Sequence, residues 1–93
     1  MTFDWDERKA RRNYAKHGLR FEEAAEVFHH PLAWFEADSD HSEQEERRRV
    51  IGECERGIVV VIFTERDERT TRIISARFAT PTERIAYVHR QGI

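Results

Sequence analysis

Basic and titratable side chains in this sequence could together support the cleavage of RNA without a metal ion. In that reaction the 2′-hydroxyl attacks the adjacent phosphorus, so an enzyme needs a proton acceptor, a proton donor for the departing 5′-oxygen and positive charge near the transition state. Arg77 and Arg66 are candidates for the positive charge. His17 titrates near neutral pH and is a candidate for proton transfer, with Glu22 and Glu23 close to it in the sequence.

Arg77 lies in a predicted strand whose other residues are mostly apolar. The alternation predicts two faces, one with Ile73, Ser75 and Arg77 and the other with Ile74, Ala76 and Phe78. A buried or cleft-facing arginine is unfavourable unless it meets an anion, which would be a phosphate if the site binds RNA. The alternative is a structural salt bridge with Glu83 or another acid of the sheet.

The other candidate side chains also have structural alternatives. Arg66 could be an ordinary turn residue, and His17 could cap the C-terminal end of a helix, where cations are favoured. Trp5 and Tyr14 could stack on RNA bases or pack within the protein. Tyr87 falls on a predicted helix with apolar neighbours, a position more typical of the edge of a core than of a catalyst.

The sequence offers little support for metal, nucleotide or nucleophile chemistry. It contains no H-E-x-x-H, paired-cysteine or EF-hand pattern, so we expect neither a metal ion nor a cofactor. The four glycines are isolated, which disfavours a phosphate-binding glycine loop. The single cysteine, Cys54, lies beside acidic residues that disfavour a thiolate, and no serine occupies an elbow motif.

Length and composition predict one small domain in a reducing compartment. The chain has 93 residues, of which 39% are hydrophobic and 37% charged, so we treat residues 1–93 as a single domain with a small core. The longest apolar run, residues 58–63, is far shorter than the ~20 residues of a membrane helix. The acidic start is unlike a signal peptide, and a lone cysteine cannot form an internal disulfide. We therefore expect a cytoplasmic protein.

The net charge of −2 conceals separate basic and acidic segments. Residues 8–17 contain basic side chains and no acid: Arg8, Lys9, Arg11, Arg12 and Lys16. Residues 36–46 are strongly acidic, and from residue 66 onward the chain has arginines but no lysine. Arginine suits bidentate contacts with phosphate or carboxylate. The alternative is that these segments are ordinary solvated faces.

The N-terminal half predicts a short strand, two helices and a second strand. Residues 3–5 could form the first strand, and Asp6 is a suitable N-cap for a basic helix that ends at about His17 before Gly18. A short second helix covers residues 21–28, and Pro31 disfavours its continuation. Residues 32–37 alternate as a strand, and the polar segment 38–46 predicts a loop.

The C-terminal half predicts three more strands and a final helix. The strands cover residues 48–53, 58–64 and 72–78, and the middle one is apolar on both faces and should be central. Thr80, Pro81 and Glu83 form a helix-start pattern for a helix that ends at about Arg90. The predicted fold is an α+β domain with a mostly antiparallel sheet of four to five strands, two N-terminal helices and one C-terminal helix.

Several stretches, in the same order, resemble the BrnT family of bacterial toxins. The first half carries Trp5-Asp6-Glu7-Arg8-Lys9, Asn13, Lys16-His17-Gly18, Phe21-Glu22-Glu23-Ala24 and Val27-Phe28. The second half carries Phe63-Thr64-Glu65-Arg66, Ile73-Ile74-Ser75-Ala76-Arg77, Glu83-Arg84 and Tyr87. The resemblance extends over nearly the whole chain.

This resemblance implies a RelE-like fold and a metal-independent ribonuclease that inhibits translation. The implied catalytic candidates are Arg77, Arg66, His17, Glu22 and Lys9. We expect Arg77 and Arg66 on the scissile phosphate and His17 or Glu22 in proton transfer. Candidate RNA-binding residues are Lys16, Arg12, Trp5 and Tyr87. The resemblance also implies a hetero-oligomer with a BrnA-type antitoxin of the ribbon-helix-helix class, which would carry the complex to operator DNA.

A non-catalytic function is the main alternative. In that case the domain would serve only as an antitoxin-binding module that acts in autoregulation of the operon. A third hypothesis is RNA binding on the ribosome without cleavage. In each case we expect the strand at residues 32–37, with Trp34 and Phe35, to be an edge or contact region. The acidic segment 36–46 would suit a basic antitoxin better than RNA.

Overall fold

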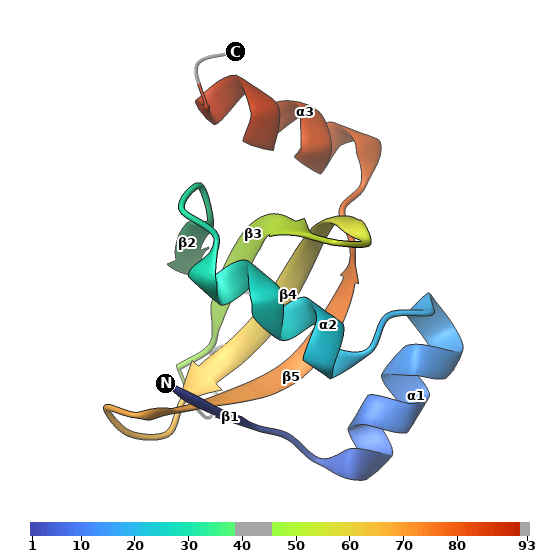
Figure 1. Cartoon of the computed structure of the whole chain (residues 1–93), viewed down its shortest axis with the longest axis vertical. Coiled ribbons are helices and arrows are strands. Elements are labelled where there is room, and N and C mark those ends of the chain that lie inside the picture. The colour runs from blue at the N-terminus through green and yellow to red at the C-terminus, as the bar shows by residue number, and fades with distance from the viewer. Residues whose placement is uncertain (39–45, 92–93) are drawn as a thin grey trace.

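Five strands and four helical segments follow one another along the described residues, 1–38 and 46–91, of the computed structural model (Figure 1). In chain order they are β1 Thr2–Asp4, α1 Glu7–His17, α2 Phe21–Ala24, the 3₁₀-helix η1 Ala25–His29, β2 Trp34–Ala37, β3 Arg48–Cys54, β4 Gly57–Glu65, β5 Thr70–Phe78 and α3 Pro81–Arg90. The predicted α+β class and helix order are confirmed. Most of the predicted loop at 38–46 lies outside the described residues.

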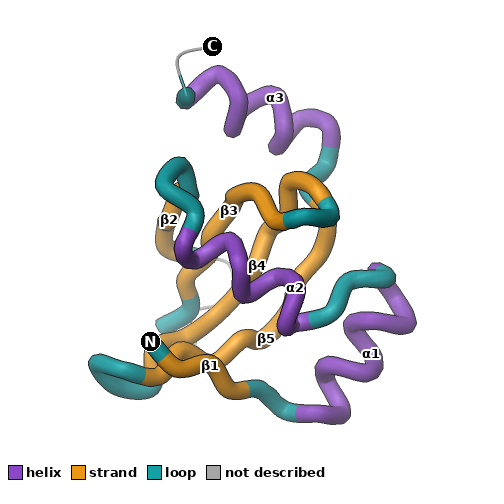
Figure 2. The backbone as a smooth tube through the Cα atoms, in the orientation of Figure 1, coloured by secondary structure: helices purple, strands orange, loops and turns teal. Residues whose placement is uncertain are grey.

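All five strands belong to one sheet with the order β1-β5-β4-β3-β2 (Figure 2). Only β1 and β5 pair in parallel, and the other neighbours are antiparallel. The apolar strand β4 lies in the middle, as predicted, because its side chains are buried on both faces of the sheet, including Val59, Val60 and Val61. The predicted strand at 32–37 is an edge strand that begins only at Trp34.

The main core forms where α2 and η1 cover one face of the sheet. Phe21, Ala24 and Val27 of these helices pack against a continuous cluster of buried residues. The sheet contributes Val50, Val59, Val61, Phe63, Ile73 and Ala76 to this cluster. Full burial of one large apolar side chain stabilises a fold by roughly 1.5–3 kcal/mol, so this layer accounts for most of the hydrophobic stabilisation.

Local capping residues explain where α1 and α3 begin and end. The Asp6 carboxylate accepts hydrogen bonds from the backbone N–H groups of Arg8 and Lys9, at 2.8 and 3.2 Å. Gly18 ends α1 with a φ of 68°, a left-handed conformation that favours glycine. At α3, Thr80 and Glu83 form a reciprocal capping box next to Pro81. The predicted bounds of both helices are confirmed.

The predicted alternation along β5 is wrong at one point. The register with β4 shifts between Ile62 and Phe63, so Ile62 faces Ser75 while Phe63 faces Ile73. One extra residue in a strand reverses the inside-outside alternation beyond it. As a result Ile73 and Ala76 both lie in the core, whereas the sequence pattern placed them on opposite faces.

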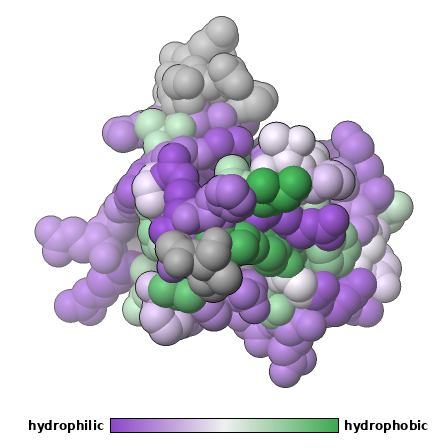
Figure 3. Space-filling model, turned by 90° about the horizontal axis from the view of Figure 1, so that it is seen from above, coloured by the Kyte–Doolittle hydropathy of each residue, from purple (hydrophilic) through white to green (hydrophobic). Residues whose placement is uncertain are grey.

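Helix α3 lies beyond one end of the sheet (Figure 1), and most of its residues are exposed. Only Tyr87 of α3 is buried, while Ile85 and Val88 are exposed. The Tyr87 hydroxyl donates a hydrogen bond to the carbonyl of Leu32 at 3.0 Å. Seen from the α3 end, the surface is mostly hydrophilic, with several hydrophobic areas among the hydrophilic ones (Figure 3). None of the helices in the described residues is long and apolar enough to cross a membrane.

The side chain of Asn13 links α1 to the part of β5 that does not pair with β1. Strand β1 pairs only with residues Thr70 to Arg72 of β5, so the rest of that strand needs other partners for its backbone. The buried Asn13 side chain accepts a hydrogen bond from Ala76 N–H at 3.0 Å and donates one to Ala76 C=O at 2.8 Å. It also donates to the carbonyl of Leu19 at 3.2 Å. The amide therefore replaces a missing strand and fixes α1 along β5.

Replacing Asn13 by alanine is expected to lower the free energy of unfolding by at least about 2 kcal/mol, because each buried polar group left without a partner costs about 1–3 kcal/mol. Urea unfolding followed by circular dichroism measures this change. Arg11→Ala, at an exposed position of the same helix, is the matched control and should change the free energy by less than about 0.5 kcal/mol. Equal stability of the two variants would contradict the role given to Asn13.

Candidate active site

The clearest cluster of candidate residues lies where the C-terminal end of α1 meets the last part of β5. Helix α1 packs along β5, which brings His17 under the influence of Arg77. Burial lowers the pKa of His17, and the positive charges of Lys16 and Arg77 lower it further from its ordinary value of 6.5. The imidazole is therefore neutral at pH 7 and has a nitrogen free to accept a proton.

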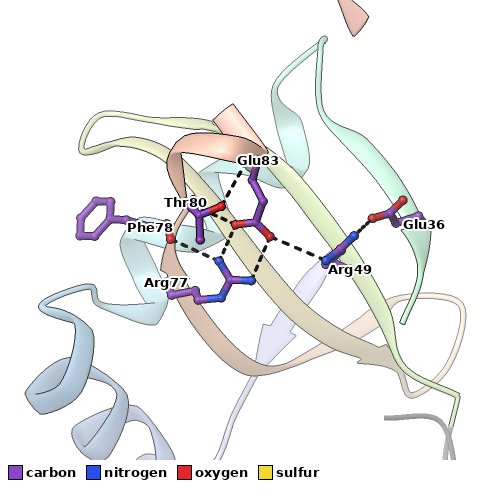
Figure 4. Close-up of polar contacts among 6 residues, drawn as sticks. All are labelled: Glu36, Arg49, Arg77, Phe78, Thr80 and Glu83. Atoms are coloured by element: carbon purple, nitrogen blue, oxygen red, sulfur yellow. Dashed lines mark hydrogen bonds and ion pairs between the residues drawn. The ribbon is translucent and has the colours of Figure 1, made fainter. Parts of the chain in front are cut away.

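Arg77 makes a two-pronged ion pair with Glu83 at the start of α3 (Figure 4). Its two terminal nitrogens lie 2.7 and 3.1 Å from the two carboxylate oxygens. Hydrogen bonding to Arg77 lowers the pKa of Glu83 to about 2, and the same contact raises the pKa of Arg77. The salt bridge that the sequence offered as an alternative therefore exists, and any phosphate at Arg77 must compete with this carboxylate.

A second arginine, Arg49 of β3, reaches the same carboxylate from the other side (Figure 4). Its nitrogen lies 3.8 Å from a Glu83 oxygen, and it also forms an ion pair with Glu36 of β2. The sequence analysis missed Arg49, which stands in a run of three arginines without any local sign of its role. The strand pairing places Arg49 opposite Glu36, and the position of α3 then brings Glu83 to the same side chain.

Basic side chains follow one flank of α1. At 100° per residue, Lys9, Arg12 and Lys16 fall on the side of the helix opposite the groove that Arg11 and Tyr14 line with α2. All three basic residues are exposed. This arrangement leaves their charges available to the phosphates of a strand that approaches His17.

Glu22 lies elsewhere. It lines a groove of about 210 Å³ between α1 and α2, together with Tyr14 and Arg20. Its neighbour Glu23 instead pairs with Arg56, a residue of the β3–β4 turn that the sequence analysis did not single out. The structure thus places His17 where the charge of Arg77 lowers its pKa, whereas Glu22 lines a groove that includes neither residue.

The structure also separates Arg66 from Arg77. Arg66 follows β4, and its N–H donates to the carbonyl of Thr70 at the start of β5. Arg77 stands seven positions after Thr70 in β5, roughly 23 Å at about 3.3 Å per residue. Arg66 therefore lies beside the start of β5 and Arg77 near its end, and the expectation that both hold one scissile phosphate stays a prediction.

Two of the aromatic candidates, Tyr87 and Trp5, pack within the protein. Tyr87 is only 3% exposed, and its hydroxyl donates a hydrogen bond to the carbonyl of Leu32, while its role in RNA binding stays a prediction. Trp5 packs edge-on against Phe21 with ring centroids 5.8 Å apart, and its indole N–H donates to Glu7. Packing, rather than an open stacking face, is thus the main contact of Trp5.

In the described parts of the chain, no group of three or more His, Cys, Asp or Glu side chains could hold a metal ion. An imidazole such as that of His17 can transfer a proton, and a guanidinium such as that of Arg77 can bind an anion.

Comparison with known proteins identifies the family. The family model described as "Ribonuclease toxin, BrnT, of type II toxin-antitoxin system" matches residues 5–83. The crystal structure of the Brucella abortus ribonuclease toxin BrnT matches with a TM-score of 0.68 and 33% sequence identity, over 86% of this chain and 97% of that chain. No curated protein sequence matches the chain. The motifs, the fold and these two matches agree, and the chain belongs to the BrnT family of ribonuclease toxins of type II toxin–antitoxin systems.

Proposed function

We propose that this protein is an endoribonuclease toxin that cleaves RNA without a metal ion and thereby inhibits translation. The observation that carries the proposal is that α1 packs along β5 and brings His17 close enough to Arg77 for this positive charge to help lower the pKa of the imidazole. A neutral imidazole can accept a proton, and a guanidinium can bind two phosphate oxygens at once. Together they supply the base and the positive charge that cleavage by the 2′-hydroxyl requires.

In the proposed reaction His17 removes the proton from the 2′-hydroxyl of the nucleotide before the scissile bond. The 2′-oxygen then forms a bond to phosphorus while the bond from phosphorus to the 5′-oxygen breaks. Arg77 stabilises the negative charge that develops on the phosphoryl oxygens. The departing 5′-oxygen takes a proton from water, and the hydroxide so formed takes the proton held by His17. The products are a 2′,3′-cyclic phosphate and a 5′-hydroxyl, and His17 is neutral again.

Lys9, Arg12 and Lys16 are proposed to hold the flanking phosphates. Their common flank on α1 and their exposure support this role. Each phosphate contact to a single strand contributes about 0.7 to the slope of log affinity against log salt, so RNA binding should weaken clearly as the salt concentration rises. The proposed reaction gives no role to Trp5, Glu22 and Arg66, which stay predictions from the sequence.

The experiment that tests the proposal is incubation of the purified, partner-free protein with end-labelled RNA in excess EDTA. We expect cleavage that yields 2′,3′-cyclic phosphate ends. RNA that stays intact with and without ribosomes would overturn the proposed activity. It would favour a second candidate, a non-catalytic antitoxin-binding module for operon autoregulation, which the pairing of Arg77 with Glu83 supports.

Membership of a type II toxin family implies an antitoxin partner. We propose that this partner is a BrnA-type protein of the ribbon-helix-helix class that forms a hetero-oligomer with the toxin and binds operator DNA. The edge strand β2 is the proposed contact region, because Trp34 and Phe35 remain 37% and 38% exposed on its opposite faces. In the same assay, added antitoxin should stop cleavage by the parent and leave Trp34→Ala partly active. Full inhibition of both would exclude this contact region.

A further inference from the structure

The Glu83 carboxylate lies between two guanidinium groups that belong to different strands. We propose that this position is a phosphate-binding site formed by Arg77 and Arg49, and that Glu83 occupies it until an RNA phosphate displaces the carboxylate. The inference rests on the proposed function, because it adds a second phosphate-binding arginine to the same centre. It also identifies Glu83 as a carboxylate that competes with the phosphate for this site.

The distances describe a site already arranged for an anion. Arg77 presents two nitrogens to the two oxygens of Glu83, at 2.7 and 3.1 Å, and Arg49 approaches one of these oxygens at 3.8 Å. The backbone N–H of Thr80 adds a hydrogen bond at 2.9 Å to the oxygen that Arg77 holds more closely. A phosphodiester offers two unesterified oxygens in a similar spacing and can accept the same fork of nitrogens.

The charges allow one anion to replace the other. The two positive charges of Arg77 and Arg49 are balanced by the two negative charges of Glu83 and Glu36, with which they form ion pairs. A phosphodiester carries one negative charge, as a carboxylate does, so displacement of Glu83 leaves the balance of the site unchanged. The lowered pKa of Glu83, about 2, agrees with a strong preference for an anion at this point.

The proposed phosphate site is also accessible from the solvent. A cavity of about 160 Å³ opens beside Glu83 and Arg49, between the sheet and α3. Both guanidinium side chains are 37% exposed, and the Glu83 side chain is 24% exposed. Displacement of the carboxylate therefore needs rotation of one side chain at the start of an exposed helix, without unfolding of the sheet.

Two substitutions separate the roles of these residues. Glu83→Gln removes the charge, and glutamine can still complete the capping box of α3. Arg49→Gln removes the second guanidinium. Arg48→Gln is the matched control, because Arg48 is the neighbour of Arg49 in β3. The Arg48 side chain is 38% exposed and that of Arg49 is 37% exposed. Arg48 forms its ion pair with Glu65 on the opposite face of the sheet.

The first measurement is the affinity of each variant for a 2′-O-methyl RNA oligonucleotide that cannot be cleaved. A hydrogen bond to a charged group contributes about 1.5–3 kcal/mol, so Glu83→Gln should bind about tenfold more tightly and Arg49→Gln about tenfold more weakly than the parent. Arg48→Gln should bind like the parent. Equal affinities of Arg49→Gln and Arg48→Gln, or weaker binding by a folded Glu83→Gln, would overturn the inference.

The second measurement does not need RNA, so it distinguishes failure of the inference from failure of the proposed function. Inorganic phosphate should raise the melting temperature of Glu83→Gln, and this rise should disappear in Glu83→Gln/Arg49→Gln but persist in Glu83→Gln/Arg48→Gln. A rise without any RNA binding would retain the phosphate site and overturn the ribonuclease. The absence of a rise in Glu83→Gln would overturn the site even if the protein cleaves RNA.

Discussion

Arg77→Lys is expected to reduce RNA cleavage by about 10²–10³-fold, the usual loss when one group that stabilises the charge of a transition state is removed. Lysine keeps the positive charge and can still pair with Glu83, so the variant should remain folded. It cannot, however, present two nitrogens to two phosphoryl oxygens in the fixed geometry of a guanidinium. Expression of the variant should therefore no longer arrest growth, and the purified protein should leave labelled RNA largely intact.

The control for this substitution is Arg48→Lys, which alters a comparable ion pair at 2.6 Å on the other face of the sheet. Its cleavage rate should equal that of the parent. Circular dichroism and thermal unfolding of both variants show whether the fold is kept. Full activity of a correctly folded Arg77→Lys would remove Arg77 from the mechanism and leave its pair with Glu83 as a purely structural contact.

His17→Gln is expected to reduce the cleavage rate by about 10²–10⁴-fold while RNA affinity changes little, because general base catalysis contributes an effect of this size. The pH dependence gives a sharper test. The neutral imidazole is the active form, so the rate of the parent should rise with pH through the pKa of His17 and become constant above it. Burial and the charges of Lys16 and Arg77 lower that pKa, so the midpoint should lie below 6.5.

Glutamine at position 17 cannot change its charge, so this rise in rate below pH 6.5 should be absent from His17→Gln. His89→Gln is the control, because His89 is an exposed histidine on α3, away from the contact of α1 with β5. It should keep both the rate and the pH dependence of the parent. A midpoint above 6.5 in the parent would show that the group that titrates is not a histidine in this environment.

The sequence was sufficient to determine features that depend on neighbours along the chain. Asp6 and Gly18 mark the two ends of α1, and Thr80 with Glu83 marks the start of α3. These caps act through hydrogen bonds between residues only a few positions apart, so their types and spacing contain the necessary information. The central position of β4 also followed from the sequence, because only a strand buried on both faces tolerates an unbroken apolar run.

The tertiary structure alone decided how distant residues meet. The bulge in β5 changes which side chains share a face, and no local pattern marks it. The pairing of β3 with its neighbours brings Arg49 to Glu83, although 34 positions separate them in the sequence. The length of β5 keeps Arg66 away from Arg77. Strand register and long-range ion pairs depend on the packing of the whole sheet, so residue types could name candidates for the site but could not say which of them lie together.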